Sequence, residues 1–187
     1  MEVSKLIKSK EPDARTTCTL TKEGGDSLAC LTSEFGLTQK RIFSSIFEQP
    51  SLLDAVLDFA KTIGDTPEQR QTRKSVVIGK KDLKSLNEIS KSNGLSRDLL
   101  IESTIRFLAL LLIKDKDGRI AKHKEALGRL NDLWATMGTL EKELFELLAD
   151  GDPILERYSK VVVVLINLVN EIEAEIATGA NIDPEGI

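Results

Sequence analysis

The sequence predicts a mostly α-helical protein in which two short strands pair antiparallel among the helices and an α-helical hairpin follows at the C-terminal end. Three observations support this prediction. Residues 15–49 and 73–107 repeat one order of strand, helix, Gly-Leu-Thr/Ser turn and helix at an offset of 58 positions. Residues 119–149 place apolar side chains at alternating three- and four-residue spacing, which is typical of a long helix with a seam. Residues 154–176 read as a further helix after a break at 150–153.

Composition is that of a helical protein with one core and an appendage. The 187 residues are 41% hydrophobic and 30% charged. The most apolar runs, 107–113 and 161–166, are shorter than the roughly 18 residues that a membrane span needs. We therefore expect a soluble, cytoplasmic protein without a membrane partner. Cys18 and Cys30 fall at apolar pattern positions, which favours reduced core residues over a disulfide or a metal pair.

Charge is unevenly distributed along the chain. The net charge is −4, but residues 1–117 carry 19 Lys/Arg against 17 Asp/Glu, whereas residues 118–187 carry 7 against 13. Within the first part, residues 70–84 hold six basic side chains and a single acid, Asp82. This stripe is either a local anion-binding surface or a solvated charged face.

The first copy follows a segment, residues 1–14, that we expect to be flexible. Cys18 and Leu20 share one face of its strand. Its first helix is weakened by Gly24 and Gly25, each of which costs roughly 1 kcal/mol relative to Ala in a helix interior. An amphipathic helix at 50–64 and a polar, flexible connection at 65–72 then reverse the chain.

The second copy shows the same order more clearly. Residues 74–78 end in three β-branched side chains, and Leu83, Leu86 and Ile89 recur at helical spacing before Asn93 and Gly94 end the helix. Ser96 then stands where a helix N-cap hydroxyl is expected, and the following helix runs to about residue 113.

The stretch from Val76-Val77-Ile78 through Gly94-Leu95-Ser96-Arg97 to Ile105 resembles the ribbon-helix-helix (Arc/MetJ-like) DNA-binding family. The resemblance covers about 70 of the 187 residues. It implies a tandem ribbon-helix-helix domain over residues 15–117, as in TraY-type conjugation proteins, because one copy alone is too small to bury its helices. In that family two antiparallel strands enter the DNA major groove, and the N-termini of the second helices hold flanking phosphates.

Strand alternation assigns residues to these roles. Cys18, Leu20, Val76 and Ile78 are expected to face the helices. The expected DNA-binding residues lie on the outer face of the ribbon or in the basic stripe, and they are Arg15, Thr17, Thr19, Arg73, Lys74, Ser75, Val77 and Lys80. Val77 departs from a polar reading face: it suits either a thymine methyl group or packing against protein.

Phosphate anchors are expected at the N-termini of the two second helices. They are Thr38 with Lys40 and Ser96 with Arg97. Helix N-capping alone explains the two hydroxyls equally well.

The C-terminal segment 119–177 is predicted to form a helical hairpin that joins protomers into a homo-oligomer or recruits a protein partner, with a flexible tail at 178–187. Residues 161–166 are β-branched enough that a strand remains an alternative there. The expected contact residues form the seam of the first helix: Leu127, Leu130, Trp134, Met137, Leu140 and Leu144.

No catalytic, cofactor or metal site is predicted. The single histidine, His123, is read as a solvated side chain, and no phosphate-binding loop, CxxC or HExxH motif occurs. The expected function is sequence-specific binding of double-stranded DNA, of the transcriptional repressor type, by a protein that is not an enzyme. The alternatives are an interaction or scaffold subunit for a toxin, nuclease or defence complex, and an accessory protein of a plasmid-transfer relaxosome.

Overall fold

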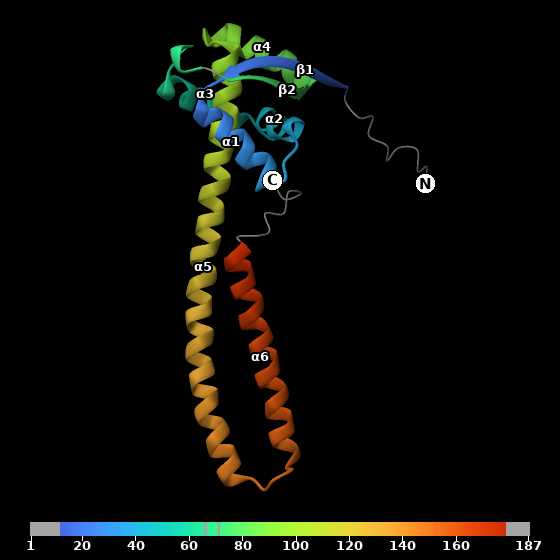
Figure 1. Ribbon diagram of the computed structural model, residues 1–187, viewed down its shortest axis with the longest axis vertical. Coiled ribbons are helices and arrows are strands. Elements are labelled where there is room, and N and C mark those ends of the chain that lie inside the picture. The colour runs from blue at the N-terminus through green and yellow to red at the C-terminus, as the bar shows by residue number, and fades with distance from the viewer. Residues whose placement is uncertain (1–11, 66, 71, 179–187) are drawn as a thin grey trace, which may run out of the picture. The chain divides into compact units, whose positions relative to one another are not determined.

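The computed structural model describes residues 12–65, 67–70 and 72–178 (Figure 1). These residues form two strands, six α-helices and one 3-10 turn. In chain order the elements are β1 (Asp13–Leu20), α1 (Lys22–Ser33), α2 (Gln39–Phe47), α3 (Pro50–Ile63), η2 (Pro67–Gln69), β2 (Thr72–Gly79), α4 (Lys80–Asn93), α5 (Arg97–Leu147) and α6 (Pro153–Thr178). They divide into two compact units, one ending at Ile113 and the other beginning at Lys114. The mostly helical fold with a two-stranded antiparallel sheet agrees with the sequence prediction.

The ends that the sequence predicted to be flexible, 1–14 and 178–187, lie largely outside the described residues. Where they are described, the prediction is wrong. Asp13 and Ala14 belong to β1, where they pair with Gly79 and Ile78 of β2, and Thr178 ends α6. Asp13 and Ala14 are ordered because β2, which lies far along the chain, pairs with them.

β1 and β2 pair antiparallel over their full length. Cys18, Leu20, Val76 and Ile78 are each at most 1% exposed, which confirms the predicted inward face of the ribbon. Burying these four side chains against the helices fixes the register, because a slip by one residue would turn all of them toward solvent.

The helices of the first copy begin at threonine caps. Thr21 accepts a hydrogen bond from the Gly24 amide before α1, and Thr38 accepts one from the Arg41 amide before α2. Between these helices Gly36 adopts a left-handed φ of 63°, which a glycine reaches without strain. α3 then starts with Pro50 in its first turn and ends at Gly64, as the sequence predicted.

The connection between the copies is more ordered than predicted. Of residues 65–72, Pro67–Gln69 form a 3-10 turn and Thr72 opens β2, while 66 and 71 lie outside the described residues. Arg70 is held by an ion pair with Asp65 at 3.0 Å and by a hydrogen bond to the Ser96 hydroxyl. These two partners, one within the stretch and one 26 positions away, explain why this polar stretch is fixed.

α4 follows β2 directly and ends at Gly94, whose φ of 64° is the predicted left-handed turn. The Ser96 hydroxyl then accepts a hydrogen bond from the Leu99 amide at 3.2 Å, which confirms Ser96 as a helix cap. Both second helices enter the core: α2 packs on β2 and contacts α3 and α4. The largest fully buried side chains of this unit include Ile42, Phe43 and Ile46 of α2 and Leu100, Ile101 and Ile105 of α5.

The predicted end of the second copy's last helix near residue 113 is wrong. α5 continues without interruption from Arg97 to Leu147, a run of 51 residues that includes the polar segment 114–118. Polar residues are tolerated there because the helix surface is exposed, and Asp115 and Arg119 form an ion pair one turn apart at 3.3 Å. Gly118 costs only about 1 kcal/mol relative to Ala, too little to end a long helix.

The second unit is a helical hairpin of α6 and the part of α5 that follows Lys114 (Figure 1). Polar contacts between its helices occur near the middle of the hairpin and near its open end. The Tyr158 hydroxyl donates to the Met137 carbonyl, and His123 Nδ1 lies 3.3 Å from Glu175 Oε2. The reversal occurs after Leu147, with Gly151 at φ 84°. Residues 161–166 are helical, so the alternative of a strand is wrong.

Candidate nucleic-acid interface

The ribbon has a symmetric register about its centre. Thr17 faces Ser75, and these two residues are 58 positions apart, the offset of the sequence repeat. The flanking outward pairs are Arg15 with Val77 and Thr19 with Arg73. Rotation by half a turn about the central pair therefore exchanges equivalent positions of the two copies. We call these six outward residues the outer row, and Arg15 and Arg73 lie at its opposite ends.

The outer row is open to solvent at most positions. Arg15, Thr17, Arg73 and Ser75 are exposed, and Thr19 and Val77, which occupy equivalent positions, are half-buried. Of the other two residues predicted to bind DNA, Lys74 pairs with Cys18 and Lys80 is the first residue of α4, and both are exposed. The structure therefore gathers all eight predicted residues on or beside the ribbon.

Reciprocal hydrogen bonds lock each strand to the second helix of the other copy. The backbone amide of Thr19 donates to Asp98 Oδ2 at 2.9 Å, and that of Val77 donates to Gln39 Oε1 at 2.8 Å. Thr19 and Val77 are equivalent strand residues, and each acceptor lies in the first turn of α5 or α2. Both amides point away from the partner strand, so these bonds satisfy donors on the ribbon edges.

Sequence reasoning missed Gln39 and Asp98. Each lies one or two positions after a predicted cap, Thr38 or Ser96, so their nearness to the caps was the available signal. Their role as acceptors depends on the antiparallel register of the strands. The repeat implies that the two strands pair, but it does not say which residues face each other.

The predicted phosphate anchors differ in how freely they could meet a ligand. Thr38 is exposed and its hydroxyl caps α2. The Ser96 hydroxyl both caps α5 and accepts Arg70 Nη1 at 3.2 Å, so it is already engaged twice. Lys40 Nζ lies 2.8 Å from Asp13 Oδ1, and Arg97 Nη2 donates to the Thr17 carbonyl at 3.0 Å. Both cations therefore lie against β1, Lys40 at its first residue and Arg97 at its centre.

A buried carboxylate, also missed by sequence reasoning, secures this arrangement from within. Glu102 of α5 is 1% exposed and accepts hydrogen bonds from the Thr21 hydroxyl and, at 3.3 Å, from the Thr21 amide. Arg70 Nε and Arg106 Nη1 lie 3.7 and 3.5 Å from its two oxygens. Glu102 thus links the start of α1, and the connection at residues 65–72, to α5.

The Cys18 thiol lies beneath the outer row. Burial, with Asp98 as a second cause, raises its pKa from 9.0 to about 11. Its Sγ lies 3.8 Å from the Lys74 carbonyl oxygen. Cys18 is therefore a protonated core residue at neutral pH, as the sequence pattern indicated.

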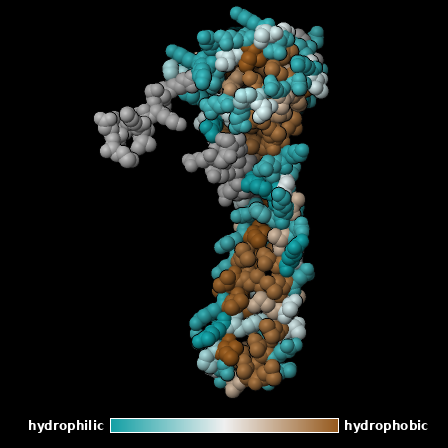
Figure 2. Space-filling view, turned by 180° about the vertical axis from the view of Figure 1, so that it is seen from behind, coloured by the Kyte–Doolittle hydropathy of each residue, from teal (hydrophilic) through white to brown (hydrophobic). Residues whose placement is uncertain are grey.

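The residues predicted to mediate association divide into two groups. Leu127, Leu130, Met137 and Leu144 are half-buried within the hairpin, whereas Trp134 and Leu140 are 42% and 43% exposed. Other exposed large apolar residues of the hairpin were not predicted to mediate association, and they include Leu133, Phe145, Leu147, Ile154, Val161, Val163, Val164, Ile166 and Leu168. Figure 2 shows contiguous apolar surface along the hairpin on the face it presents.

His123 was expected to be a solvated side chain without a partner nearby in the sequence. The hairpin brings Glu175 to 3.3 Å from its Nδ1, a contact that sequence distance concealed. Among the described residues, no group of three or more His, Cys, Asp or Glu side chains is arranged to hold a metal ion. Within the same residues, none of the helices has the combination of length and apolar character needed to cross a membrane.

Comparison with models of known protein families, with curated proteins and with solved structures finds no match to this chain.

Proposed function

We propose that residues 15–107 are a tandem ribbon-helix-helix domain, completed within one chain, that binds double-stranded DNA by placing β1 and β2 in the major groove. The observation that carries the proposal is the ribbon itself. Equivalent residues Thr17 and Ser75 face each other at its centre, and the outer row around them is largely exposed.

Groove dimensions and side-chain chemistry support this function. The major groove is wide enough for a two-stranded ribbon, whose outward side chains then meet base edges. Arg15 and Arg73 at opposite ends of the row suit the O6 and N7 acceptors of guanine, and Thr17 and Ser75 at its centre suit several base edges. Phosphates on either side would meet the exposed Lys74 and Lys80 and the capped N-terminus of α2.

The test is selection of preferred sites from a pool of random-sequence DNA duplexes, followed by titration of the selected duplex. Arg15→Ala together with Arg73→Ala is expected to weaken binding to that duplex by roughly 30-fold or more, because two base contacts of about 1–3 kcal/mol each are lost. The same double variant is expected to bind unselected duplex only a few-fold more weakly, since most contacts there are to phosphate.

The matched control removes two positive charges elsewhere. Lys61→Ala with Lys91→Ala changes the net charge equally from the exposed surfaces of α3 and α4. This variant is expected to keep preference for the selected sequence. If the wild-type chain enriches no sequence, or if both double variants lose the same affinity, base readout by the ribbon is wrong.

A second candidate function is an interaction subunit that uses the ribbon surface to bind protein. Val77 favours it, because an apolar side chain in the outer row packs well on protein, and Asp13 adds a negative charge at the end of β1. On this alternative, Val77→Asp abolishes capture of the partner from the native host, Arg15→Ala with Arg73→Ala does not, and neither variant changes DNA binding beyond that of the control.

A further inference from the structure

We propose that the hairpin formed by residues 114–178 packs face to face on the hairpin of a second copy of this chain, with the two α5 helices antiparallel. The proposal goes beyond DNA binding and is independent of it. It rests on apolar rows, the area of the face they form and charge placement within the hairpin.

Two rows of exposed apolar side chains follow the hairpin at seven-residue spacing. On α5 they are Leu133, Leu140 and Leu147, at 48, 43 and 79% exposure, and on α6 they are Ile154, Val161 and Leu168, at 53, 57 and 42%. Seven residues are nearly two helical turns, so each row stays on one face.

Both rows lie on the same side of the hairpin. On α5, half-buried Met137 and Leu144 mark the line that faces α6, and the apolar row lies beside this line, on one side of it around the helix axis. The α6 row is rotated from buried Leu165 in the same sense about its own axis. Because the helices run antiparallel, the same rotational sense carries both rows to one face, which we call the apolar face.

The apolar face has the size of a stable interface. Residues 122–150 extend for about 40 Å along α5 and its end, and two adjacent helices are about 20 Å wide. The face therefore offers roughly 800 Å² per partner, which is the amount that specific interfaces of standard size bury. A single hairpin leaves this area in contact with water, which favours association.

Charge placement favours a second copy in the antiparallel direction. On α5, Arg129 and Glu143 lie seven residues on either side of Thr136, and on α6, Arg157 and Glu171 lie seven residues on either side of Val164. A two-fold axis across the helices near these centres brings each arginine to the matching glutamate of the second copy.

The two centres lie at similar heights in the hairpin. The contacts of Met137 with Tyr158 and of His123 with Glu175 place Thr136 within about one turn of the level of Val164. One two-fold axis therefore serves both helices.

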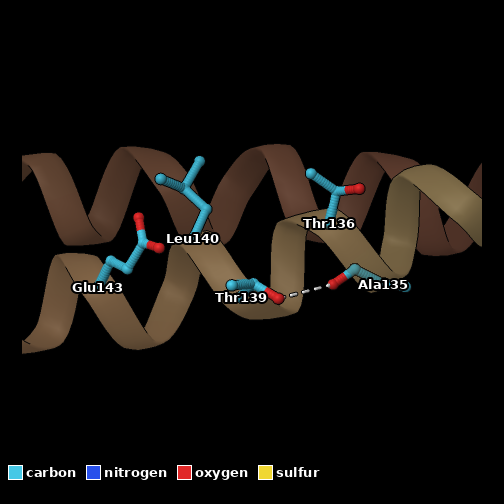
Figure 3. Close-up of a pocket in the computed structure, with 5 residues that line it drawn as sticks. All are labelled: Ala135, Thr136, Thr139, Leu140 and Glu143. Carbon is cyan, nitrogen blue, oxygen red and sulfur yellow. Dashed lines mark hydrogen bonds between the residues drawn. The ribbon is translucent and has the colours of Figure 1, made fainter.

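A hollow on α5 borders the apolar face. It is lined by Ala135, Thr136, Thr139, Leu140 and Glu143 (Figure 3). Ala135 and Thr139 lie about 100° or more around the helix from Leu140, on the side away from α6, so the hollow marks the outer edge of the face.

A different alignment of two copies, with α5 against α6, would place the two hairpin turns at the same end. Residues 131–160 carry seven Asp/Glu against three Lys/Arg, so that alignment brings two acidic ends together. The antiparallel alignment instead places each acidic end beside the neutral end of the other hairpin, where the six Lys/Arg of residues 114–130 balance six Asp/Glu in residues 114–130 and 161–178.

The test measures self-association of the full chain by sedimentation equilibrium over a range of concentrations and salt. The wild type is expected to approach twice its 20.6 kDa mass. Arg129→Glu or Glu143→Arg alone is expected to raise the dimer dissociation constant about 10- to 30-fold, because the symmetry applies each reversal twice. The combination of both is expected to restore most of the affinity, since the pairs are re-formed with opposite polarity.

The matched control is Lys142→Glu, a reversal at an exposed α5 position that points away from the apolar face. It is expected to leave the dissociation constant within a few-fold of wild type, and far-ultraviolet circular dichroism checks that every variant keeps its helices. A wild type that stays monomeric at all concentrations overturns the proposal. So does restoration by Arg129→Glu with Glu171→Arg in place of the combination with Glu143→Arg, because it would assign the α5-to-α6 alignment.

Discussion

The most informative stability experiment concerns Gly24, which the sequence presents as a defect in α1. A Cβ atom added at Gly24 would lie 3.0 Å from Cγ and 3.2 Å from Oε1 of Glu102. Glu102 cannot withdraw easily, since Thr21 holds both its oxygens and Arg70 and Arg106 flank them. The glycine therefore makes room for a buried carboxylate, and Gly24→Ala tests that role.

Two opposing effects decide the sign of the change. Alanine gains up to about 1 kcal/mol of helix propensity over glycine, whereas forcing a methyl group into a packed site costs about 1–3 kcal/mol. We expect Gly24→Ala to destabilise the first unit by about 1 kcal/mol. Glu102→Ala alone should cost about 2–3 kcal/mol, because Thr21 loses its charged acceptor and Arg70 and Arg106 each lose one of two carboxylates. In the Glu102→Ala background, Gly24→Ala should stabilise by about 1 kcal/mol, since the methyl group enters vacated space.

The assay is native-state hydrogen exchange of the paired β1 and β2 amides, which reports on this unit alone. Tryptophan fluorescence would not do so, because Trp134 lies in the hairpin. The four chains of the double-mutant cycle give the coupling free energy, which we expect to be about 2 kcal/mol. If Gly24→Ala has the same effect in both backgrounds, the close approach of Glu102 is not what the glycine serves.

The remaining predictions concern the ribbon and the turns. Because burial raises the folded-state pKa of Cys18 from 9.0 to about 11, the stability it contributes is complete below pH 9 and is lost between about pH 9 and 11. Urea unfolding across this range should show a steeper loss in the wild type than in Cys18→Ala. Gly94→Ala, at a φ of 64°, should cost about 1 kcal/mol by thermal unfolding, whereas Gly118→Ala should be neutral or stabilising. Ser96→Ala should cost more than the roughly 1 kcal/mol of a lost cap, since Arg70 also loses its acceptor.

Local patterns in the sequence were sufficient to predict the inward face of the ribbon and the turns that follow its first helices. Alternation identified Cys18 and Val76 as inward residues, since a strand has only two faces and one of them must be apolar. Gly94 and Ser96 were identified because a left-handed turn and a helix cap each require a few residue types at fixed positions.

Features that depend on distant partners were not predictable. Glu102 interrupts an apolar helix face and reads as a surface residue, yet it is buried because Thr21, 81 positions away, and two arginines meet it. The continuity of α5 was missed for a related reason. Charged residues around Gly118 read as a break, but a helix continues through them when neighbouring segments are stable on both sides.

The proposed DNA-binding function makes a prediction about what association of two chains contributes. In a ribbon made from two chains, dissociation destroys the reading surface, whereas here β1 and β2 pair within one polypeptide. Loss of the hairpin contact should therefore leave binding to a single site intact and reduce only the advantage of a duplex with two sites, where the second engagement is intramolecular. Arg129→Glu is expected to lower affinity for a two-site duplex toward the value for one site, with no change for one site itself. A variant that weakens single-site binding as well would mean that the ribbon is not self-sufficient, and the proposed recognition of DNA by one chain would then be wrong.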